Sequence, residues 1–440
     1  MRRLFVSAII AMMAISTGLY AQEEDTAQGE PKVNLKVVYE RTFDEPIVDV
    51  IFGEAGVSLN EAKQMGWREE AFSAEEKSEK TVKIFYPKVV ITSRTESIDY
   101  PGEPEGEMRA KEIKFYDENG QLTKTVSAGH RLLRSENGRY LVVANLFGDG
   151  YDKEGKYIYH PGGGIIYNWD GDEIGKIPSG RVWQVSDNGY VLGEWAVYDS
   201  LGREIGLLKP DISEKYLSAE AICYRMSRDG GYIVTTLSMF GPKEAIYILW
   251  DKTGRILWKK EFPFEVTGSM PLSHSLIENV GIVGKTWGSI IMVDWDGELL
   301  WDIKKPTGGN YRSKFSHNNK KVFMISSSGY VFCFDALAGK ILWQHKADWS
   351  RTAIANNHPD KKYYYDRLIL LKDDEVIAAR TLVGYGGPAS GVIFIDANNG
   401  DLLLEATDYQ NVSGLVSKDN ILFIIEKHKL KGHVLAGGKK

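Results

Sequence analysis

The sequence predicts an all-β protein in which about seven four-stranded antiparallel sheets stack around a common axis and close into one ring. Three observations predict this fold. One turn motif flanked by apolar strands recurs along most of the chain, a second turn motif precedes most of its copies, and the composition favours turns and strands. The 440 residues include 45 Gly, 23 Tyr and 11 Trp, as expected for many tight turns that join aromatic-rich strands.

The first turn motif is an apolar run, an aromatic residue, Asp, a few turn residues, Gly and a second apolar run. Its Asp is expected to open a hairpin turn by bonding its own backbone two residues on, and its Gly to close the turn in the left-handed conformation. The closing Gly residues lie between Gly120 and Gly400, so the six intervals average about 47 residues. The seven copies span 115–120, 167–171, 197–202, 249–254, 293–297, 333–339 and 394–400.

The second turn motif is Ser, two polar residues, often Gly, and then an aromatic or aliphatic strand. Its copies begin at Ser135, Ser186, Ser227 and Ser316, with a degenerate copy at 372–377. Two hairpins in each period make a four-stranded antiparallel sheet that is too small to be stable alone. Stacking such sheets radially buries their faces, which is the architecture of a β-propeller. Seven blades is the first choice and eight the second.

A last copy of the second motif, at 417–424, has no Asp-Gly hairpin behind it. The strand predicted at 33–39 has no repeat marker before it and can supply the missing partner. Pairing it with the C-terminal strands, 420–425 and 432–436, would close the ring and protect its last edge.

Residues 58–80 interrupt the repeat and are predicted to be helical. Ser58 with Glu61 and Ser73 with Glu76 both fit a capping box. A solvated, charged insertion is preferred here over a partner-binding element.

The predicted organisation is a signal peptide at 1–21, a flexible linker at 22–32, a propeller at 33–437 and a tail at 438–440. Arg2 and Arg3 precede an apolar stretch that is short for a membrane span, and Ala21 offers a small residue for cleavage. No later apolar run approaches the length of a membrane span. The mature chain is therefore predicted to be exported, either periplasmic or secreted, and to have no transmembrane segment.

Charge and cysteine content narrow the function further. The net charge of −6 leaves no basic surplus for a phosphate backbone, so nucleic acid is not expected as a partner. An exported chain with only Cys223 and Cys333 is not a disulfide scaffold. Both cysteines lie in apolar strand-like runs, which favours two separate buried thiols over one bridge.

Three copies of the first motif resemble the Asp-x-x-Thr-Gly-Lys-x-x-Trp repeat of quinoprotein-type (PQQ-like) β-propellers: 251–258, 294–301 and 335–343. The resemblance covers most of 82–437 as architecture. Trp-Asp pairs also give some blades a similarity to WD40 repeats. In the other four copies the Trp position holds Lys124, Gly175, Gly206 and Leu404.

The resemblance implies a propeller fold much more firmly than a function. The superfamily includes quinone-dependent dehydrogenases and non-catalytic outer-membrane assembly scaffolds. The dehydrogenases carry a vicinal disulfide, whereas Cys223 and Cys333 are far apart in the sequence. No calcium-ligand set can be matched residue by residue, so no catalytic residue is transferred to this chain.

Other candidate sites are weak. The eight histidines, at 130, 160, 274, 317, 345, 358, 428 and 433, show no metal-ligand spacing. His428 and His433 are expected in a solvated hairpin. Acidic residues alternate with turn residues at 149–154 as in a calcium loop, but their spacing fails the Asp-x-Asp-x-Asp-Gly pattern. The glycine runs at 162–164 and 384–387 do not fit a phosphate loop and are expected between blade strands.

No catalytic or metal residue is therefore predicted, and the cofactor site is unknown, with PQQ and calcium left open. The preferred function is that of an exported, monomeric, non-catalytic propeller that binds a protein or a cell-envelope polymer as a scaffold. The alternative is a quinoprotein-like oxidoreductase or another enzyme with its site in the central channel.

Overall fold

The computed structural model describes residues 34–93, 110–129, 131–145, 149–151, 157–159, 162–209, 221–238, 245–262, 273–277, 281–285, 289–304, 306, 311–326, 329–346, 363–383, 389–406, 409 and 412–436. The predicted signal peptide, linker and tail lie outside these residues.

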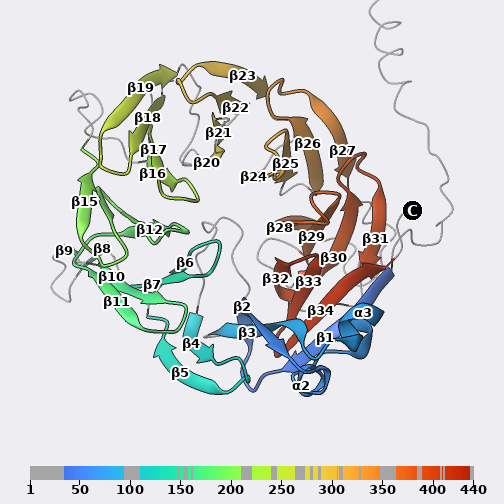
Figure 1. Ribbon diagram of the computed structural model, residues 1–440. Coiled ribbons are helices and arrows are strands. Elements are labelled where there is room, and N and C mark those ends of the chain that lie inside the picture. Colours follow the sequence, from blue (N-terminus) through green and yellow to red (C-terminus); the bar gives the residue numbers. More distant parts are fainter. Residues whose placement is uncertain are drawn as a thin grey trace, which may run out of the picture.

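The described residues form a β-propeller in which four-stranded antiparallel sheets are arranged as blades around an axis (Figure 1). This confirms the predicted all-β ring. The described residues make up eight blades, the second of the two counts that the sequence allowed. Each of the seven Asp-Gly motifs supplies the outer hairpin of one blade, and the two chain ends together build an eighth.

The first four blades follow the chain order. Blade 1 contains β2 (Ile47–Val57), β3 (Val82–Ser93), β4 (Ala110–Tyr116) and β5 (Leu122–Ser127). Blade 2 contains β6 (Arg131–Arg134), β7 (Tyr140–Ala144), β10 (Gly164–Asn168) and β11 (Glu173–Ile177), with a separate hairpin of β8 (Asp149–Tyr151) and β9 (Tyr157–Tyr159). Blade 3 contains β12 (Val182–Val185), β13 (Val191–Gly193), β14 (Ala196–Tyr198) and β15 (Glu204–Leu207). Blade 4 contains β16 (Ala221–Met226), β17 (Tyr232–Ser238), β18 (Ala245–Asp251) and β19 (Ile256–Phe262).

The remaining blades complete the ring. Blade 5 contains β20 (Ser273–Ile277), β21 (Gly281–Lys285), β22 (Ser289–Val293) and β23 (Leu299–Lys304). Blade 6 contains β24 (Tyr311–Phe315), β25 (Lys321–Ser326), β26 (Tyr330–Asp335) and β27 (Ile341–Lys346). Blade 7 contains β28 (Tyr363–Leu371), β29 (Val376–Val383), β30 (Ala389–Asp396) and β31 (Leu402–Ala406). Blade 8 contains β32 (Val412–Lys418), β33 (Ile421–Glu426), β34 (Lys429–Ala436) and the N-terminal strand β1 (Asn34–Thr42).

The Asp-Gly motifs form the hairpin turns that the sequence predicts. In blade 4, Asp251 Oδ1 accepts hydrogen bonds from the backbone N–H groups of Thr253 and Arg255, at 2.9 and 3.2 Å. Gly254 closes the turn with a φ of 81°. A side chain at this position would be strained, because L-residues with a Cβ rarely adopt that conformation.

The ring closes through the two chain ends, as predicted. β1 pairs antiparallel with β34, from Asn34 opposite Ala436 to Thr42 opposite Lys429. Figure 1 shows β1 lying against β34 where the first and last parts of the chain meet. The closure removes two exposed strand edges.

The segment 58–80 contains α2 (Leu59–Gln64), the 3-10 turn η1 (Glu69–Ala71) and α3 (Ala74–Ser78), and both predicted capping boxes are present. Its interpretation as a solvated insertion is wrong for its central part. Residues 66–68 lie along the outer edge of β1, where Glu40 N–H donates to Gly66 O at 3.1 Å and Arg68 N–H donates to Val38 O at 2.8 Å.

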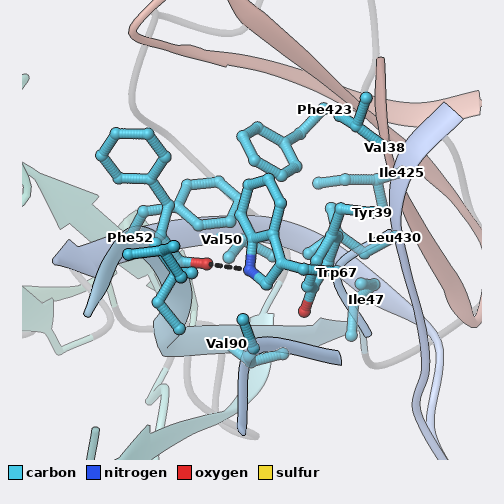
Figure 2. Packing of buried hydrophobic residues seen from close by; sticks show 14 of the residues in the cluster. Val38, Tyr39, Ile47, Val50, Phe52, Trp67, Val90, Phe423, Ile425 and Leu430 are labelled. Carbon is cyan, nitrogen blue, oxygen red and sulfur yellow. Dashed lines mark hydrogen bonds between the residues drawn. The ribbon is translucent and has the colours of Figure 1, made fainter. Parts of the chain in front are cut away.

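Trp67 anchors this segment in the core of blades 1 and 8 (Figure 2). Its side chain is buried, and its indole N–H donates to Phe85 O at 3.1 Å. Its ring contacts the rings of Tyr39 and Phe423, with centroids 5.1 and 6.5 Å away. The insertion therefore covers the edge of the closing strand, which would otherwise be free to pair with another chain.

The Trp of the PQQ-like repeat joins successive blades on the outside of the ring. Trp258, Trp301 and Trp343 each donate the indole N–H to a backbone carbonyl in the Asp-Gly turn of the next blade, at 2.7, 2.9 and 3.1 Å. The receiving carbonyls belong to Trp295, Ala336 and Ala397.

Where this Trp is missing, the blades join in other ways. Lys124 donates instead to the carbonyl of Gly171 in the next turn. At Gly175 and Gly206 the two backbones meet directly, because a Cβ on either residue would lie 2.4 Å from a backbone carbon of the following turn. A glycine is needed at such a close approach of two backbones.

Polar side chains join neighbouring blades nearer the axis. They stabilise the contact between blades, because a buried carbonyl or charge is costly unless it has a partner inside the protein. The pairs are Asp49 with Arg134 at 2.5 Å, Arg131 with Val182 O at 2.9 Å, Gln184 with the backbone of Met226 at 3.0 Å, Arg380 with Ser413 O at 2.7 Å, and Ser413 with Ile47 O at 2.8 Å.

Candidate functional site

The candidate site is the set of turns between the first and second strands of the blades, here named the turn ring. These turns hold equivalent places in equivalent blades, so they lie at the same end of the propeller and near its axis. The turn ring comprises residues 135–138, 186–189, 227–230, 316–319, 372–375 and 418–420, together with Glu54 and Lys83 of blade 1.

Each Ser motif forms a tight turn of its own. Ser227 Oγ donates to Asp229 at 2.6 Å and accepts from the backbone N–H of Tyr232 at 3.0 Å. Gly230 has a φ of 81° and donates its N–H to Ser227 O. The serine therefore has a structural role that explains its recurrence, since its buried hydroxyl satisfies the turn.

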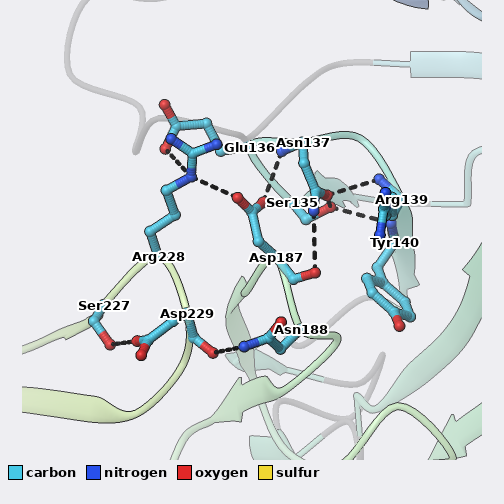
Figure 3. A network of polar contacts seen from close by, with 10 residues as sticks. All are labelled: Ser135, Glu136, Asn137, Arg139, Tyr140, Asp187, Asn188, Ser227, Arg228 and Asp229. Carbon is cyan, nitrogen blue, oxygen red and sulfur yellow. Dashed lines mark hydrogen bonds and ion pairs between the residues drawn. The ribbon is translucent and has the colours of Figure 1, made fainter. Parts of the chain in front are cut away.

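Asp187 connects three consecutive blades, as Figure 3 shows. Its carboxylate accepts the backbone N–H of Asn137 in blade 2 at 2.7 Å and pairs with Arg228 Nε in blade 4 at 2.5 Å. Its own N–H donates to Arg228 O at 2.8 Å. The Asp187 side chain is only 14% exposed, whereas that of Arg228 is 55% exposed and that of Glu136 is 60% exposed. Asp187 therefore positions the exposed Arg228 directly, and it holds the turn that carries the exposed Glu136 through the N–H of Asn137.

A second group joins blades 6, 7 and 8. Asp374 accepts from His317 twice, at 2.5 Å from the backbone N–H and at 2.7 Å from the ring Nδ1. Lys372 N–H donates to Asn420 Oδ1 at 2.8 Å. Lys372, Asp373 and Asp374 all have positive φ, at 51°, 51° and 70°. This conformation costs roughly 1–2 kcal/mol per ordinary residue, so the turn depends on these partners.

Blade 8 meets blade 1 through a charged group on the same turns. Glu54 pairs with Lys418 at 2.8 Å and with Lys83 at 3.0 Å, and Lys83 also approaches Asp419 at 3.4 Å. The hydrogen bonds from Lys418 and Lys83 lower the pKa of Glu54. These ion pairs are exposed, so each contributes little stability, but together they present fixed charges of both signs.

The chemistry of the turn ring suits recognition. Among the described residues, no group of three or more His, Cys, Asp or Glu side chains could hold a metal ion. The ring presents charged side chains, such as Arg228 and Glu136, on turns that are joined by hydrogen bonds in blades 2 to 4 and in blades 6 to 8. Such rigid surface loops on a scaffold are where binding sites commonly occur.

The histidines named from the sequence do not gather into one site in the described part of the chain. His317 lies in the turn ring, His345 on β27 and His428 beside Phe43 O, while His130, His160 and His358 and the His274 side chain lie outside the described residues. The hairpin predicted around His428 is present. The prediction that His433 is solvated is wrong. His433 is buried on β34, where Tyr409 Oη lies 3.1 Å from Nε2.

The cysteines and the glycine and acidic runs named from the sequence do not form a site in the described part of the chain. Cys333 is a buried free thiol, and burial raises its pKa to about 12; the Cys223 side chain lies outside the described residues. Gly163 belongs to a loop, donating its N–H to Gly180 O. In the partial calcium motif, 152–154 lie outside the described residues, as does the run 384–387.

The sequence identified the turns of the ring but not their connections. Asn137 and Asp187 are 50 residues apart in the chain, and no local pattern links them. The recurring acidic or amide residue two or three positions after each Ser was the available signal.

Comparisons with known proteins agree with this fold. A family model described as outer membrane protein assembly factor BamB matches residues 180–438, which is more than half of the chain. No curated protein matches significantly. None of the helices in the described residues is long and apolar enough to cross a membrane.

Solved structures with a similar fold have low sequence identity. BamB from Moraxella catarrhalis is 10% identical, with 91% of this chain and 100% of that chain covered and a TM-score of 0.50. The computationally designed Ika8 protein is 14% identical, with 91% and 99% covered and a TM-score of 0.49. The C-terminal WD40 domain of Sif2 is 12% identical, with 93% and 100% covered and a TM-score of 0.49. At 10% identity, the likeness to the Moraxella catarrhalis structure concerns the fold alone.

Proposed function

Because the chain belongs to the family described as outer membrane protein assembly factor BamB, we propose that it is an exported, non-catalytic scaffold that binds protein partners in the cell envelope. The family match is the observation that carries this proposal. The predicted signal peptide supports export, and the periplasm is the compartment that the family description favours.

We place partner binding on the turn ring. Its turns are joined by hydrogen bonds in blades 2 to 4 and in blades 6 to 8, so little conformational entropy would be lost there when a partner binds. Arg228 and Glu136 are largely exposed and lie 3.6 Å apart, while Asp187, which holds Arg228, is mostly covered. Exposed charges of both signs on a rigid frame fit a folded protein surface that carries complementary charges.

A pull-down from the native envelope fraction tests this proposal. The mature chain, from residue 22, is the bait, and Glu136→Lys is the variant because Glu136 is exposed at the edge of the network in Figure 3, beside Arg228. Glu204→Lys is the matched control, since Glu204 is also exposed but lies on the outer strand β15. We expect defined envelope proteins to be captured by the wild type and by Glu204→Lys, and to be reduced with Glu136→Lys.

Two results would contradict the proposal. If Glu136→Lys captures the same proteins as the wild type, partner binding does not use this part of the turn ring. If the protein purified from its native host carries a quinone absorption band and oxidises an alcohol, the non-catalytic assignment is wrong.

A further inference from the structure

A pocket of about 310 Å³ lies at the seam where the ring closes. One wall is the end of β1 and the connection to β2, including Arg41 and Glu45, and the other is formed by β4 and its turn, including Tyr116 and Gly120. Pockets for small ligands begin at about 300 Å³, so this one would admit a group of roughly one or two amino-acid residues.

Arg41 lies across the seam and is held in position. Its guanidinium lies 5.2 Å from the ring centroids of both Phe43 and Tyr116, and Nη2 donates to Gly120 O at 3.3 Å. A guanidinium has five N–H donors, and no carboxylate among the described residues pairs with this one. Arg41 therefore presents a fixed donor fork whose charge is not neutralised by a protein anion.

The other charges of the pocket are largely balanced. Glu45 accepts from Lys111 and Lys114, each at 2.8 Å, and these bonds lower the pKa of Glu45. Asp44 is exposed and also lines the pocket, and Glu112 lies 3.9 Å from Lys114. Counted together, Arg41, Lys111 and Lys114 balance the three carboxylates of Asp44, Glu45 and Glu112, so the pocket has no net charge. A polyanion would be repelled by these carboxylates, whereas a single carboxylate could be held by the Arg41 guanidinium, which no protein carboxylate pairs with among the described residues.

Apolar side chains complete the lining. Ile47 and Val90 are buried and form part of the wall, and Leu122 is 53% exposed. A ligand with an apolar body could therefore cover Leu122 while its anionic end meets Arg41. Arginine recognises a carboxylate through two parallel hydrogen bonds, which gives both energy and orientation.

We propose that this seam pocket binds a single carboxylate carried next to an apolar side chain, as in an N-blocked apolar amino acid or the C-terminal residue of a polypeptide. Such a ligand would contact both sides of the closure at once. The pocket would bind it whether or not the turn ring binds a protein.

Saturation-transfer NMR titrations of the mature chain test the pocket. The probes are N-acetyl-leucine, its amide, a pentapeptide that ends in leucine, and the same pentapeptide amidated at its C-terminus. We expect both free carboxylates to bind and both amides to bind at least about tenfold more weakly, because hydrogen bonds to a charged group are strong. Tighter binding of the free pentapeptide identifies a polypeptide terminus as the source, and equal binding identifies a small carboxylate.

Two variants assign the binding to this pocket. Arg41→Gln removes the fork and should weaken binding about tenfold, with Arg203→Gln as the control because Arg203 is an exposed arginine in blade 3. Since Arg41 also joins the seam, Leu122→Glu provides a variant that leaves the buried core intact. It should weaken binding more than Leu122→Gln, because only the glutamate repels the ligand.

The proposal is overturned by any of three results. These are amides that bind as tightly as the carboxylates, no binding of any probe, or wild-type affinity in both Arg41→Gln and Leu122→Glu.

Discussion

Trp343 on the outer strand of blade 6 lies directly against Gly400 in the turn of blade 7. A Cβ on Gly400 would lie 2.7 Å from the Trp343 ring, and the Trp343 indole N–H donates to Ala397 O at 3.1 Å. The Gly and the Trp of the repeat therefore form one contact between neighbouring blades. Because the Gly has no side chain, the Trp ring of the preceding blade can pack directly against the turn.

Replacing Trp343 tests this inter-blade contact. Trp343→Phe should lower the free energy of unfolding by about 1–2 kcal/mol, because the Ala397 carbonyl then keeps only the longer hydrogen bond from Lys321 Nζ, at 3.4 Å. Trp343→Ala should cost about 3–5 kcal/mol through the cavity that it creates. Urea denaturation measures both variants, and equal stability of Trp343→Phe and the wild type would show that the hydrogen bond contributes nothing.

The turn glycines allow backbone strain to be separated from crowding. Gly254 and Gly180 both have positive φ, at 81° and 86°, but a Cβ on Gly254 would lie 2.4 Å from Leu207 O while one on Gly180 would meet nothing within 4 Å. Gly180→Ala should therefore cost about 1–2 kcal/mol for the conformation alone. Gly254→Ala should cost more, and Gly254→Val at least as much. Similar melting temperatures for Gly180→Ala and Gly254→Ala would contradict the close approach.

Removing the closing blade should destabilise the whole ring. Deleting residues 413–440 removes nearly all of β32 together with β33 and β34, so β1 loses its partner and the cores of blades 1 and 7 are opened. We expect aggregation and proteolytic cleavage throughout the chain, because apolar faces and strand edges become exposed. Limited proteolysis and size-exclusion chromatography measure this. A truncated chain that stays monomeric with an unchanged melting temperature would refute closure by β1.

His433 predicts a loss of stability in mild acid. Burial is the main reason that its pKa falls from 6.5 to about 4. Below pH 6.5 the unfolded chain takes up a proton that the folded chain resists until about pH 4, so stability falls as the pH falls through this window. The loss from this group is roughly 2–3 kcal/mol.

The control for this effect is His433→Gln, which keeps a polar partner for Tyr409 but does not titrate. Its stability should fall less steeply between pH 6.5 and 4 than that of the wild type. Some slope should persist, because burial also lowers the pKa of His345. Parallel curves for the two proteins would rule out His433 as the source.

Local chemistry explains what the sequence determined by itself. An Asp that accepts two backbone N–H groups and a Gly at positive φ, as in Asp251 and Gly254, specify a hairpin within five residues. The recurrence of that hairpin predicts the blades, and the unpaired strands at the two ends predict the closure. The capping boxes of α2 and α3 were readable for the same reason, since each acts across only three residues.

Contacts between distant residues decided the rest. The sequence favoured seven blades over eight because the turn of the last blade at Lys427 and His428 carries no Asp-Gly motif, and because the strands of that blade come from both ends of the chain. Trp67 looked like part of a charged insertion, although its burial depends on Tyr39 and Phe423, which the closed ring brings together. Likewise, Arg41 meets Gly120 only across the seam. A turn is specified by neighbours in sequence, whereas the core, the turn ring and the seam pocket are made by residues that meet only when the ring is closed.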